Sequence, residues 1–549
     1  MRDVTSESAV GSTENERQVS VRGISRRKTL LSLGGIGVVG SLFPTVSAEE
    51  GGREENQNGN RTQSLDNEIV LDWVDQALET ARRGLIIPTS GRVYAFLGAV
   101  MYDAVNGIHI QRGEGFDSGD QYAVEPDVIP GACRVAALAG AANEVLSTLA
   151  NEELDDETAG DLQKDYDGLL DEQLTEYQDG NQEAGEAWGR QVATKILEKR
   201  EDAGGECVSD WDVVDEKGGL DPGMAQRGDE WGSACLADLD PWGLEAPDTV
   251  VAPEPPDVES LEFAVEYNRT LVVGDLSRNV DDIQGTEVTF DIDEERYDED
   301  EAEQLANGKY LGGNLEEDEL GYSDDIKYDA DENELTLTIN PPDDFRDQGA
   351  FWAALPGTPQ PEGRWLQVAK ANVENENPSF YETVRLYARL GIGVQDAGIA
   401  NWNNKRRYAD RMGWRPHAST GTEEQIPDSA ADADVRPDVD DIDNPDLKTK
   451  DDWEAISGWS PAPEYASGLT TVSTTSQRLL ENEFGDVGEF EIAVETADGE
   501  TIEETFDGFD DARDQAAKSR VWSGRHYAPA MLAAIEMADE IVEEVKDSI

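Results

Sequence analysis

Apolar residues recur at helical spacing in two separate parts of this chain of 549 residues. In both parts they fall three and four positions apart, the period that places side chains on one face of an α-helix. The two runs are Ile69, Trp73, Ala77, Leu78, Val93, Leu97, Val100 and Met101, and then Phe380, Val384, Tyr387 and Leu390. The sequence therefore predicts a mainly α-helical protein, with an N-terminal helical region at 66–204 and a C-terminal helical region at 361–549.

A different pattern occupies residues 205–360, between the two helical regions. Apolar and polar residues alternate there at Val288, Phe290 and Ile292, and again at Leu335, Leu337 and Ile339, as in half-buried strands. The rest of this region is rich in Pro, Gly and acidic runs. We therefore predict an acidic insertion that contains minor β structure and long loops.

The C-terminal region carries more local predictions. Residues 469–484 show helical spacing, and alternation at 490–494 and 501–506 around an Asp-Gly pair predicts a β-hairpin. Two helices are expected to close the chain, one ending near Arg520 and one at about 527–545.

The first residues carry the features of an export signal. Arg26-Arg27-Lys28 precedes the apolar stretch 30–43, which ends before the small residues Val46-Ser47-Ala48. The Arg pair is typical of twin-arginine signals, and the stretch is shorter than the ~20 residues that span a membrane. We predict a signal peptide at 1–48, a flexible leader at 49–65, and a secreted mature protein without a membrane span.

Charge narrows the range of partners. The chain has 120 acidic and 44 basic residues, a net charge of −76. Such a chain is poorly suited to bind nucleic acid, since that affinity comes from Lys and Arg on phosphates, and anionic lipid surfaces would repel it. With 12 Trp and 15 Tyr it is too aromatic for a disordered chain. We interpret the charge as that of an acidic, halophilic protein, because concentrated salt screens self-repulsion.

Cysteine and histidine are scarce, which limits the metal chemistry. Of the three cysteines, Cys207 and Cys235 could pair in an exported protein, and an odd one remains. The only histidines are His109, His417 and His526. A zinc site built from several histidines is therefore excluded in practice.

Three segments of the C-terminal half concentrate the candidate chemistry. They are Trp402-Asn403-Asn404-Lys405 with Trp414-Arg415-Pro416, then Pro463-Glu464-Tyr465-Ala466-Ser467-Gly468-Leu469, and Ser519-Arg520-Val521-Trp522-Ser523-Gly524-Arg525-His526. Together they resemble the three-part motif of the vanadium-dependent haloperoxidases, relatives of type-2 phosphatidic-acid phosphatases and bacterial acid phosphatases. Residues 387–402 and 95–106 are also similar to helices of that family. The resemblance covers most of 66–200 and 378–545 but not the insertion.

The resemblance implies a haloperoxidase/acid-phosphatase-type helical bundle with an oxyanion site. Lys405, Arg415 and Arg520 would supply positive charge to vanadate, and Ser467 and Gly468 would donate hydrogen bonds. His526 would be the vanadium ligand. The catalytic residues implied are His526 and Lys405, and Trp402 would line a halide site, although core packing is an open alternative for it.

Three departures from the family motif stand out. Leu469 occupies the position of the histidine that ends the second motif and acts as the acid–base group; His417 is a conceivable substitute. The interval from Lys405 to Arg415 is longer than in the family, so an alternative alignment puts Tyr408, beside Arg407, at the lysine position. Ala530 replaces an acidic residue that would orient the ring of His526.

The function implied is that of an exported vanadium-haloperoxidase-like protein that uses hydrogen peroxide to oxidise halide. Leu469 makes turnover an open question, so a non-catalytic oxyanion-binding member of the same fold is a first alternative. A phosphatase acting on a phosphate ester is a second, and the missing histidine weakens it more, because a phosphate monoester needs a protonated leaving group.

Overall fold

The computed structural model describes residues 65–549 except for a set of gaps, and every described residue falls in one compact unit, Arg61–Ile549. The undescribed positions are 1–64, 86, 114–120, 126, 128–129, 178, 202–233, 294–295, 312–317, 354–356, 410, 412–443, 445, 448–452, 456–461 and 496–500. The signal peptide and leader predicted at 1–65 therefore lie almost wholly outside the described residues, as do Cys207, Arg415 and His417.

The N-terminal region folds into the helices that the apolar spacing predicts. They are α1 (Glu68–Arg82), α2 (Ile87–Arg112), α3 (Arg134–Glu153), α4 (Asp156–Glu176) and α5 (Gln182–Lys199). Side chains of Cys133, Asp155 and Asn181 accept backbone N–H groups at the starts of α3, α4 and α5. The small residues of α3 let α5 pack closely, since a Cβ on Gly189 would lie within 3.0 Å of the backbone of Ala137.

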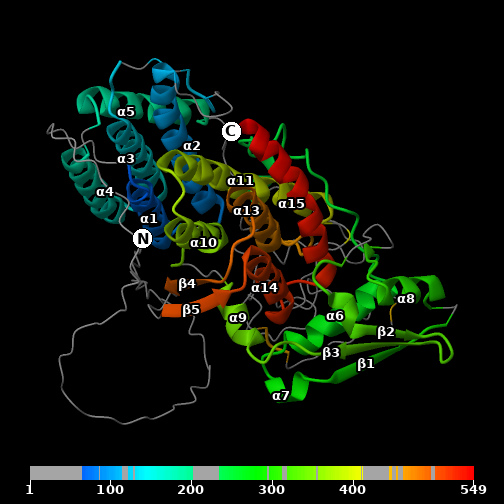
Figure 1. The fold of residues 1–549 in the computed structure, drawn as a ribbon. Coiled ribbons are helices and arrows are strands. Elements are labelled where there is room, and N and C mark those ends of the chain that lie inside the picture. Colours follow the sequence, from blue (N-terminus) through cyan, green and yellow to red (C-terminus); the bar gives the residue numbers. More distant parts are fainter. Residues whose placement is uncertain are drawn as a thin grey trace, which may run out of the picture. The chain divides into compact units, whose positions relative to one another are not determined.

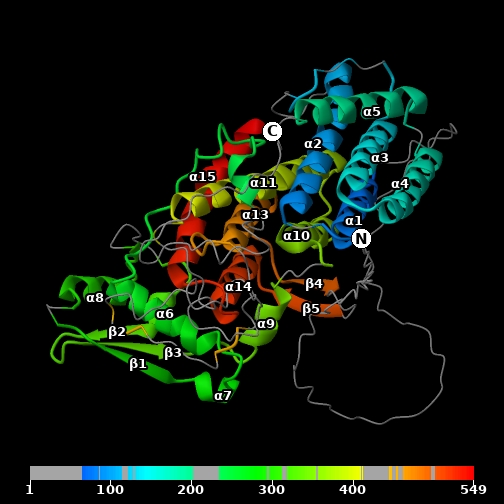
Figure 2. The same cartoon turned by 180° about the vertical axis from the view of Figure 1, so that it is seen from behind.

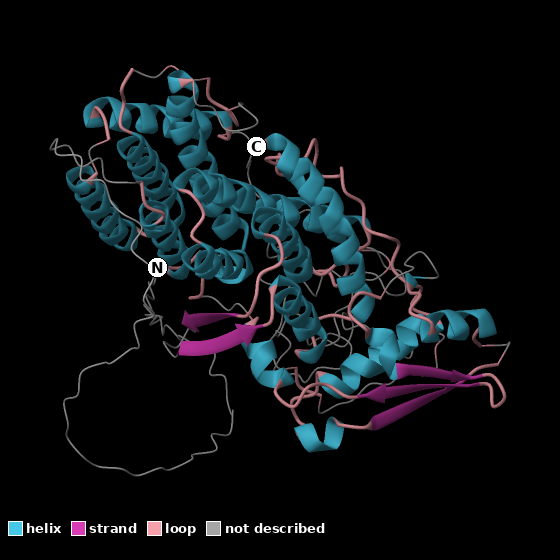
Figure 3. Cartoon of the chain, in the orientation of Figure 1, coloured by secondary structure: helices cyan, strands magenta, loops and turns pink. Residues whose placement is uncertain are grey.

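The C-terminal region forms a second set of helices. They are α10 (Gln360–Glu376), α11 (Phe380–Arg407), α13 (Gly468–Phe484), α14 (Phe509–Trp522) and α15 (Ala528–Ser548). A capping box between Ser379 and Glu382 begins α11. The predicted hairpin is present as β4 (Phe490–Glu495) paired antiparallel with β5 (Thr501–Phe506). The molecule is mainly α-helical (Figure 3), so the predicted fold class is confirmed.

Helices α2 and α11 lie side by side and join the two helical regions (Figures 1 and 2). Each contributes a glycine to the contact. A Cβ on Gly98 would lie within 3.0 Å of the backbone of Tyr387 and Ala388, and one on Gly391 would lie as close to the backbone of Tyr94. The two helices therefore approach until backbone meets backbone.

This close approach predicts opposite effects for two Gly→Ala substitutions. Gly391→Ala inserts a methyl group where no space exists and is expected to destabilise the fold by about 1–3 kcal/mol or more. Gly168→Ala, in α4, is the matched control, because nothing lies within 4 Å of the added Cβ; it is expected to stabilise by about 0.5–1 kcal/mol. Guanidinium unfolding at fixed salt measures both, and equal effects would contradict the backbone contact.

The region between the two helical sets combines a small sheet with short helices. Its elements are η2 (Ala234–Asp238), α6 (Leu261–Val273), α7 (Val280–Ile283), β1 (Thr286–Asp291), α8 (Glu299–Ala306), η4 (Tyr322–Asp325), β2 (Ile326–Asp329), β3 (Glu334–Ile339) and α9 (Phe345–Phe351). The sheet is antiparallel in the order β1-β3-β2, with Val288 opposite Leu337. The strands predicted by alternation are confirmed, and Figure 1 shows α6 and α8 beside this sheet.

Helix α6 was not expected in a region predicted to hold only minor β structure and loops. Nearly all of its residues are buried, and it contacts α14 and β3. Its sequence lacks an amphipathic stripe because polar residues are paired inside the protein: Arg269 donates to Glu266 at 2.8 Å. Tertiary contacts on every side, which local periodicity does not record, make this segment a helix.

The structure tests the predictions about cysteine pairing and membrane spans only in part. Cys133 is a buried free thiol and Cys235 is disulfide-bonded; its pairing with Cys207 stays a prediction. Among described residues, the segment Thr89–Arg112 of α2 is long and apolar enough to cross a membrane. That is weak evidence for a span, because buried core helices pass the same test and 89% of its apolar window lies inside the protein.

Glu362 gives the fold a defined dependence on pH. It lies near the start of α10, 3% exposed, where the Ser90 hydroxyl donates to it at 3.5 Å. Burial raises its pKa from the ordinary 4.5 to about 7. The folded chain therefore keeps this proton to higher pH than the unfolded chain, so its contribution to stability is full below pH 4.5 and declines as the pH rises to about 7.

Glu362→Gln removes this titration from the fold. Between about pH 4 and pH 8 we expect the unfolding free energy of the wild type to fall by about 3 kcal/mol relative to that of the variant. Unfolding of both proteins at each pH measures the difference, in which the titration of the other acidic residues cancels. A difference that does not change with pH would show that the pKa of Glu362 is the same in the folded and unfolded chains.

Candidate functional site

Lys405 occupies the last turn of α11 and points into the protein. Its side chain is 2% exposed, and the ammonium donates to the backbone carbonyls of Pro463 at 2.7 Å and Glu464 at 3.1 Å. The neighbouring Arg406 and Arg407 are exposed. The helix therefore turns Lys405 toward the protein interior and leaves its two basic neighbours at the surface.

The alternative alignment had placed Tyr408 at the lysine position. Tyr408 instead donates its hydroxyl to the carbonyl of Ala252 at 2.8 Å, in contact with the segment that runs along α11. The choice of Lys405 over Tyr408 as the oxyanion-binding residue stays a prediction.

A buried carboxylate fastens that neighbouring segment to α11. Asp396, fully buried, accepts backbone N–H groups of Trp242, Gly243 and Leu244 at 2.6–3.0 Å. Burial raises its pKa to about 6, although these hydrogen bonds favour the charged form. Asn404 adds two bonds, accepting from the Ala252 N–H and donating to the Val250 carbonyl at 2.8 Å each. The end of α11 that carries Lys405 is thereby held in place.

Ser467 and Gly468 form the N-terminus of α13. The Ser467 hydroxyl caps the helix by accepting the Thr470 N–H at 3.4 Å, and it lies 2.9 Å from the Thr470 hydroxyl. The Ser467 N–H donates to the carbonyl of Ala530 in α15 at 3.0 Å. Gly468 lies against the side chain of Asn401, which a Cβ would approach to 3.2 Å. A helix N-terminus of this kind favours negative charge.

Arg520 and His526 lie at the junction of α14 and α15. The Arg520 side chain is 8% exposed and that of His526 is 3% exposed. The chain folds back between them, because the backbone N–H groups of Arg525 and His526 both donate to the Arg520 carbonyl, at 2.9 and 3.3 Å. Thr270 of α6 donates its hydroxyl to the His526 carbonyl at 3.3 Å. The unexpected helix therefore supports the histidine.

Glu464 is a site residue that the motif analysis missed. It is completely buried, and its Oε1 lies 3.0 Å from His526 Nδ1 while accepting the Tyr527 N–H at 2.9 Å. The family's ring-orienting acid is replaced by Ala530, and in this structure Glu464 is the carboxylate on the imidazole. The one sequence signal for it was an acidic residue three positions before Ser467.

The loop 462–467 brings the predicted residues together. Lys405 donates to the Glu464 carbonyl, the Glu464 carboxylate contacts His526, and Ser467 bonds to the helix that follows His526. Arg520 joins through the turn that ends at His526. Arg415, predicted to complete the set, lies outside the described residues.

Leu469 and Trp402 lie in apolar surroundings. Leu469, 9% exposed in the first turn of α13, belongs to the main hydrophobic core. Trp402, 7% exposed, packs in a small cluster with Ile399, Leu236 and Ala462. Its described neighbours are those of a packing residue, and its halide-lining role stays a prediction. The ring of His109, near the end of α2, contacts that of Tyr381 in a tilted arrangement, and His417 is outside the described residues.

This donor set fits a tetrahedral oxyanion held by a nitrogen ligand. A carboxylate on Nδ1 favours the tautomer with hydrogen on that atom, which leaves the lone pair of Nε2 for a ligand bond. The Lys405 ammonium, which donates to two backbone carbonyls, brings a positive charge to this end of α11. The helix N-terminus and the Arg520 guanidinium add positive potential.

Comparisons with known proteins show which family and which solved structures this chain is similar to. The family described as "VCPO second helical-bundle domain" matches residues 385–549. A bacterial vanadium-dependent iodoperoxidase has a similar structure, with a TM-score of 0.56 and 18% identity over 90% of this chain and 98% of that one. A holo-type bacterial vanadium-dependent chloroperoxidase aligns with a TM-score of 0.49 and 12% identity over 89% and 99%.

Residues 385–549 therefore match a vanadium haloperoxidase domain family, and the chain shares the fold of a bacterial vanadium-dependent iodoperoxidase. The resemblance inferred from the sequence motifs is thus confirmed. No functionally curated protein matches the chain by sequence.

Proposed function

We propose that this protein is a vanadate-dependent haloperoxidase that oxidises halide with hydrogen peroxide outside the cell. The proposal of export rests on the twin-arginine-like segment at 25–48. The family membership supports the reaction class, and the contact between Glu464 and His526 carries the proposal for this chain. Burying a carboxylate beside a single imidazole costs free energy. We therefore expect this pair to have a role in a site.

In the proposed site each residue has a distinct role. His526 would bind vanadium through Nε2, with Glu464 fixing the tautomer and the ring orientation. Lys405 and Arg520, together with Arg415, would balance the negative charge of the oxyanion, and Ser467 and the Gly468 N–H would donate to its oxygens. Bound vanadate would supply the chemistry that activates peroxide toward halide.

The leucine at position 469 affects the proton-transfer step of the proposed reaction. The leucine side chain at the family's acid–base position can neither give nor take a proton. Proton transfer would then depend on water, and general acid–base help is worth about 10²–10⁴-fold. We therefore propose slow turnover. The comparisons favour neither the non-catalytic nor the phosphatase alternative.

The decisive experiment is a titration of the mature protein with orthovanadate in molar KCl, followed by calorimetry. Peroxide-dependent oxidation of iodide, bromide and chloride and hydrolysis of a phosphate ester are assayed alongside. We expect saturable vanadate binding, slow halide oxidation, and loss of both in His526→Ala. Lys546→Ala, which removes an exposed cation of α15, is the matched control. Absence of vanadate binding in the wild type would refute the proposal.

A further inference from the structure

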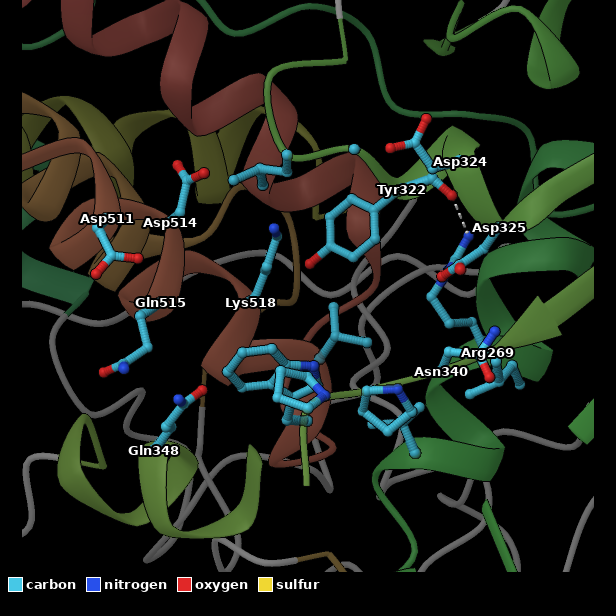
Figure 4. A pocket seen from close by; sticks show the side chains of 18 residues that line it. Arg269, Tyr322, Asp324, Asp325, Asn340, Gln348, Asp511, Asp514, Gln515 and Lys518 are labelled. Carbon is cyan, nitrogen blue, oxygen red and sulfur yellow. Dashed lines mark hydrogen bonds and ion pairs between the residues drawn. The ribbon is translucent and has the colours of Figure 1, made fainter. Parts of the chain in front are cut away.

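A cleft of about 460 Å³ lies on a face of α14 that Arg520 does not line. Its walls come from α14, from η4 with the residue before it, and from the end of β3 (Figure 4). The cleft therefore joins the acidic insertion to the helical region, apart from the proposed oxyanion site. Its volume falls in the range of small-molecule sites, about 300–1,000 Å³.

Arg269, the most buried cation of the cleft wall, is fully used by the fold. It donates to Glu266 at 2.8 and 3.3 Å, to Asp325 at 2.7 Å and to the Tyr322 carbonyl at 2.8 Å. Asp325 is likewise engaged. This pair shapes the cleft and leaves neither group for a ligand.

Unlike Arg269, Lys518 and Tyr322 have polar groups that make no hydrogen bond within the described residues. The Tyr322 side chain is 6% exposed, and its hydroxyl has no hydrogen-bond partner among the described residues. Figure 4 shows this hydroxyl and the Lys518 ammonium directed into the same space. Within the described part of the chain, Lys518 makes no hydrogen bond or ion pair. Lysine is also scarce, since the chain has only 13.

The buried hydroxyl points to a missing partner. Burial keeps the pKa of Tyr322 well above its ordinary value, so the group is a neutral donor at neutral pH. Leaving a buried donor without an acceptor costs about 1–3 kcal/mol. An acceptor placed between this hydroxyl and the Lys518 ammonium would satisfy both groups at once.

Apart from Arg269 and Lys518, the charged residues of the cleft are carboxylates. Asp514 is partly buried and contacts Arg513 at 2.8 Å, while Asp324 and Asp511 are exposed at the rim. Three carboxylates against one available ammonium make the cleft net negative, which disfavours a simple anion. A ligand that places an anion on Lys518 also needs a cation for the carboxylates.

An apolar wall completes the chemistry of the cleft. Leu320, Val521, Trp522 and Pro341 line it alongside the polar groups. Trp522 is 7% exposed, so much of its ring already packs inside the protein. The wall suits an aliphatic side chain of moderate size.

We propose that this cleft binds a free α-amino acid with an apolar side chain. Its carboxylate accepts from the Lys518 ammonium and the Tyr322 hydroxyl, and its ammonium donates to Asp514 and the rim carboxylates. Its side chain packs on Leu320 and Trp522. This site does not depend on the proposed peroxidase activity and involves no covalent step.

Three ligands that share the isobutyl group test the proposal. L-leucine, 4-methylpentanoate without the ammonium, and 3-methylbutylamine without the carboxylate are titrated against the full mature chain in molar KCl by saturation-transfer NMR. We expect leucine to bind at least tenfold more tightly than either partial ligand. Equal binding of leucine and 4-methylpentanoate, or no leucine binding, would overturn the proposal.

Two variants with matched controls locate the site. Tyr322→Phe removes only the hydroxyl and is expected to weaken leucine binding about 3–10-fold, and Lys518→Gln by at least about tenfold. Tyr328→Phe and Lys327→Gln, on β2 outside the cleft lining, are expected to bind like the wild type. Unchanged binding in Lys518→Gln would place leucine elsewhere and refute the site. Vanadate titration of the same variants is expected to be unaffected.

Discussion

Replacing Leu469 by histidine is expected to raise the rate of peroxide-dependent halide oxidation by about 10²–10⁴-fold. The position lies in the first turn of α13, two residues after the Ser467 cap, and this helix directly follows the loop that carries Glu464. An imidazole there would supply a group that can give and take a proton near neutral pH, which leucine cannot. Steady-state rates at saturating orthovanadate, compared with the wild type, measure the gain.

Leu469→Gln is the matched control for this prediction. It introduces a polar side chain at the same place but offers no titratable proton. Both variants lose part of the apolar contact of a residue that is 9% exposed, so thermal unfolding should show similar losses of stability. If glutamine raised the rate as much as histidine, access of water and not acid–base chemistry would explain the gain.

Replacing Glu464 by glutamine is expected to weaken vanadate binding by about 10–100-fold, the usual effect of losing the partner that orients a metal-ligating histidine. Glutamine keeps the size of the side chain and can still accept the Tyr527 N–H through Oε1. Its amide oxygen can also still accept the Nδ1–H of His526, but the substitution removes the negative charge 3.0 Å from Nδ1 that makes the imidazole a stronger ligand. Calorimetric titration with orthovanadate measures the change.

Glu454→Gln is the control for this substitution, because Glu454 is an exposed carboxylate ten positions before Glu464. It should bind vanadate like the wild type. A structural role for Glu464 would reduce stability without changing vanadate affinity, so unfolding is measured on the same samples. Unaltered vanadate affinity in Glu464→Gln would show that the carboxylate does not position the ligand histidine.

Much of the secondary structure follows from local patterns. Alternation at Val288–Phe290 and Leu335–Leu337 gave β1 and β3 because one face of each strand is buried in a small sheet. Helical spacing gave α11 because it buries a broad apolar face, and it gave α13 because apolar residues such as Leu469, Val472 and Leu480 recur there among buried Ser and Thr. The same spacing did not predict helix α6, because its polar Glu266 and Arg269 are buried as a pair and interrupt the apolar pattern.

The sequence by itself determined the mainly helical fold class, the family motif and the residue types of the candidate site. These depend on local periodicity and on the order of short segments along the chain. It also marked Lys405, Ser467, Arg520 and His526, because a cation or a histidine in a motif is visible without coordinates. The net charge of −76 made such cations conspicuous.

Only the tertiary structure decided which groups meet. Two alignments left Lys405 and Tyr408 as rivals, and the rotation of the last turn of α11 buries the ammonium at the Glu464 carbonyl. Glu464 itself lies 62 positions from His526, and no local pattern specifies a contact across that interval. The partners of a buried polar group are chosen by the packing of distant segments, which must satisfy its hydrogen bonds once water is excluded.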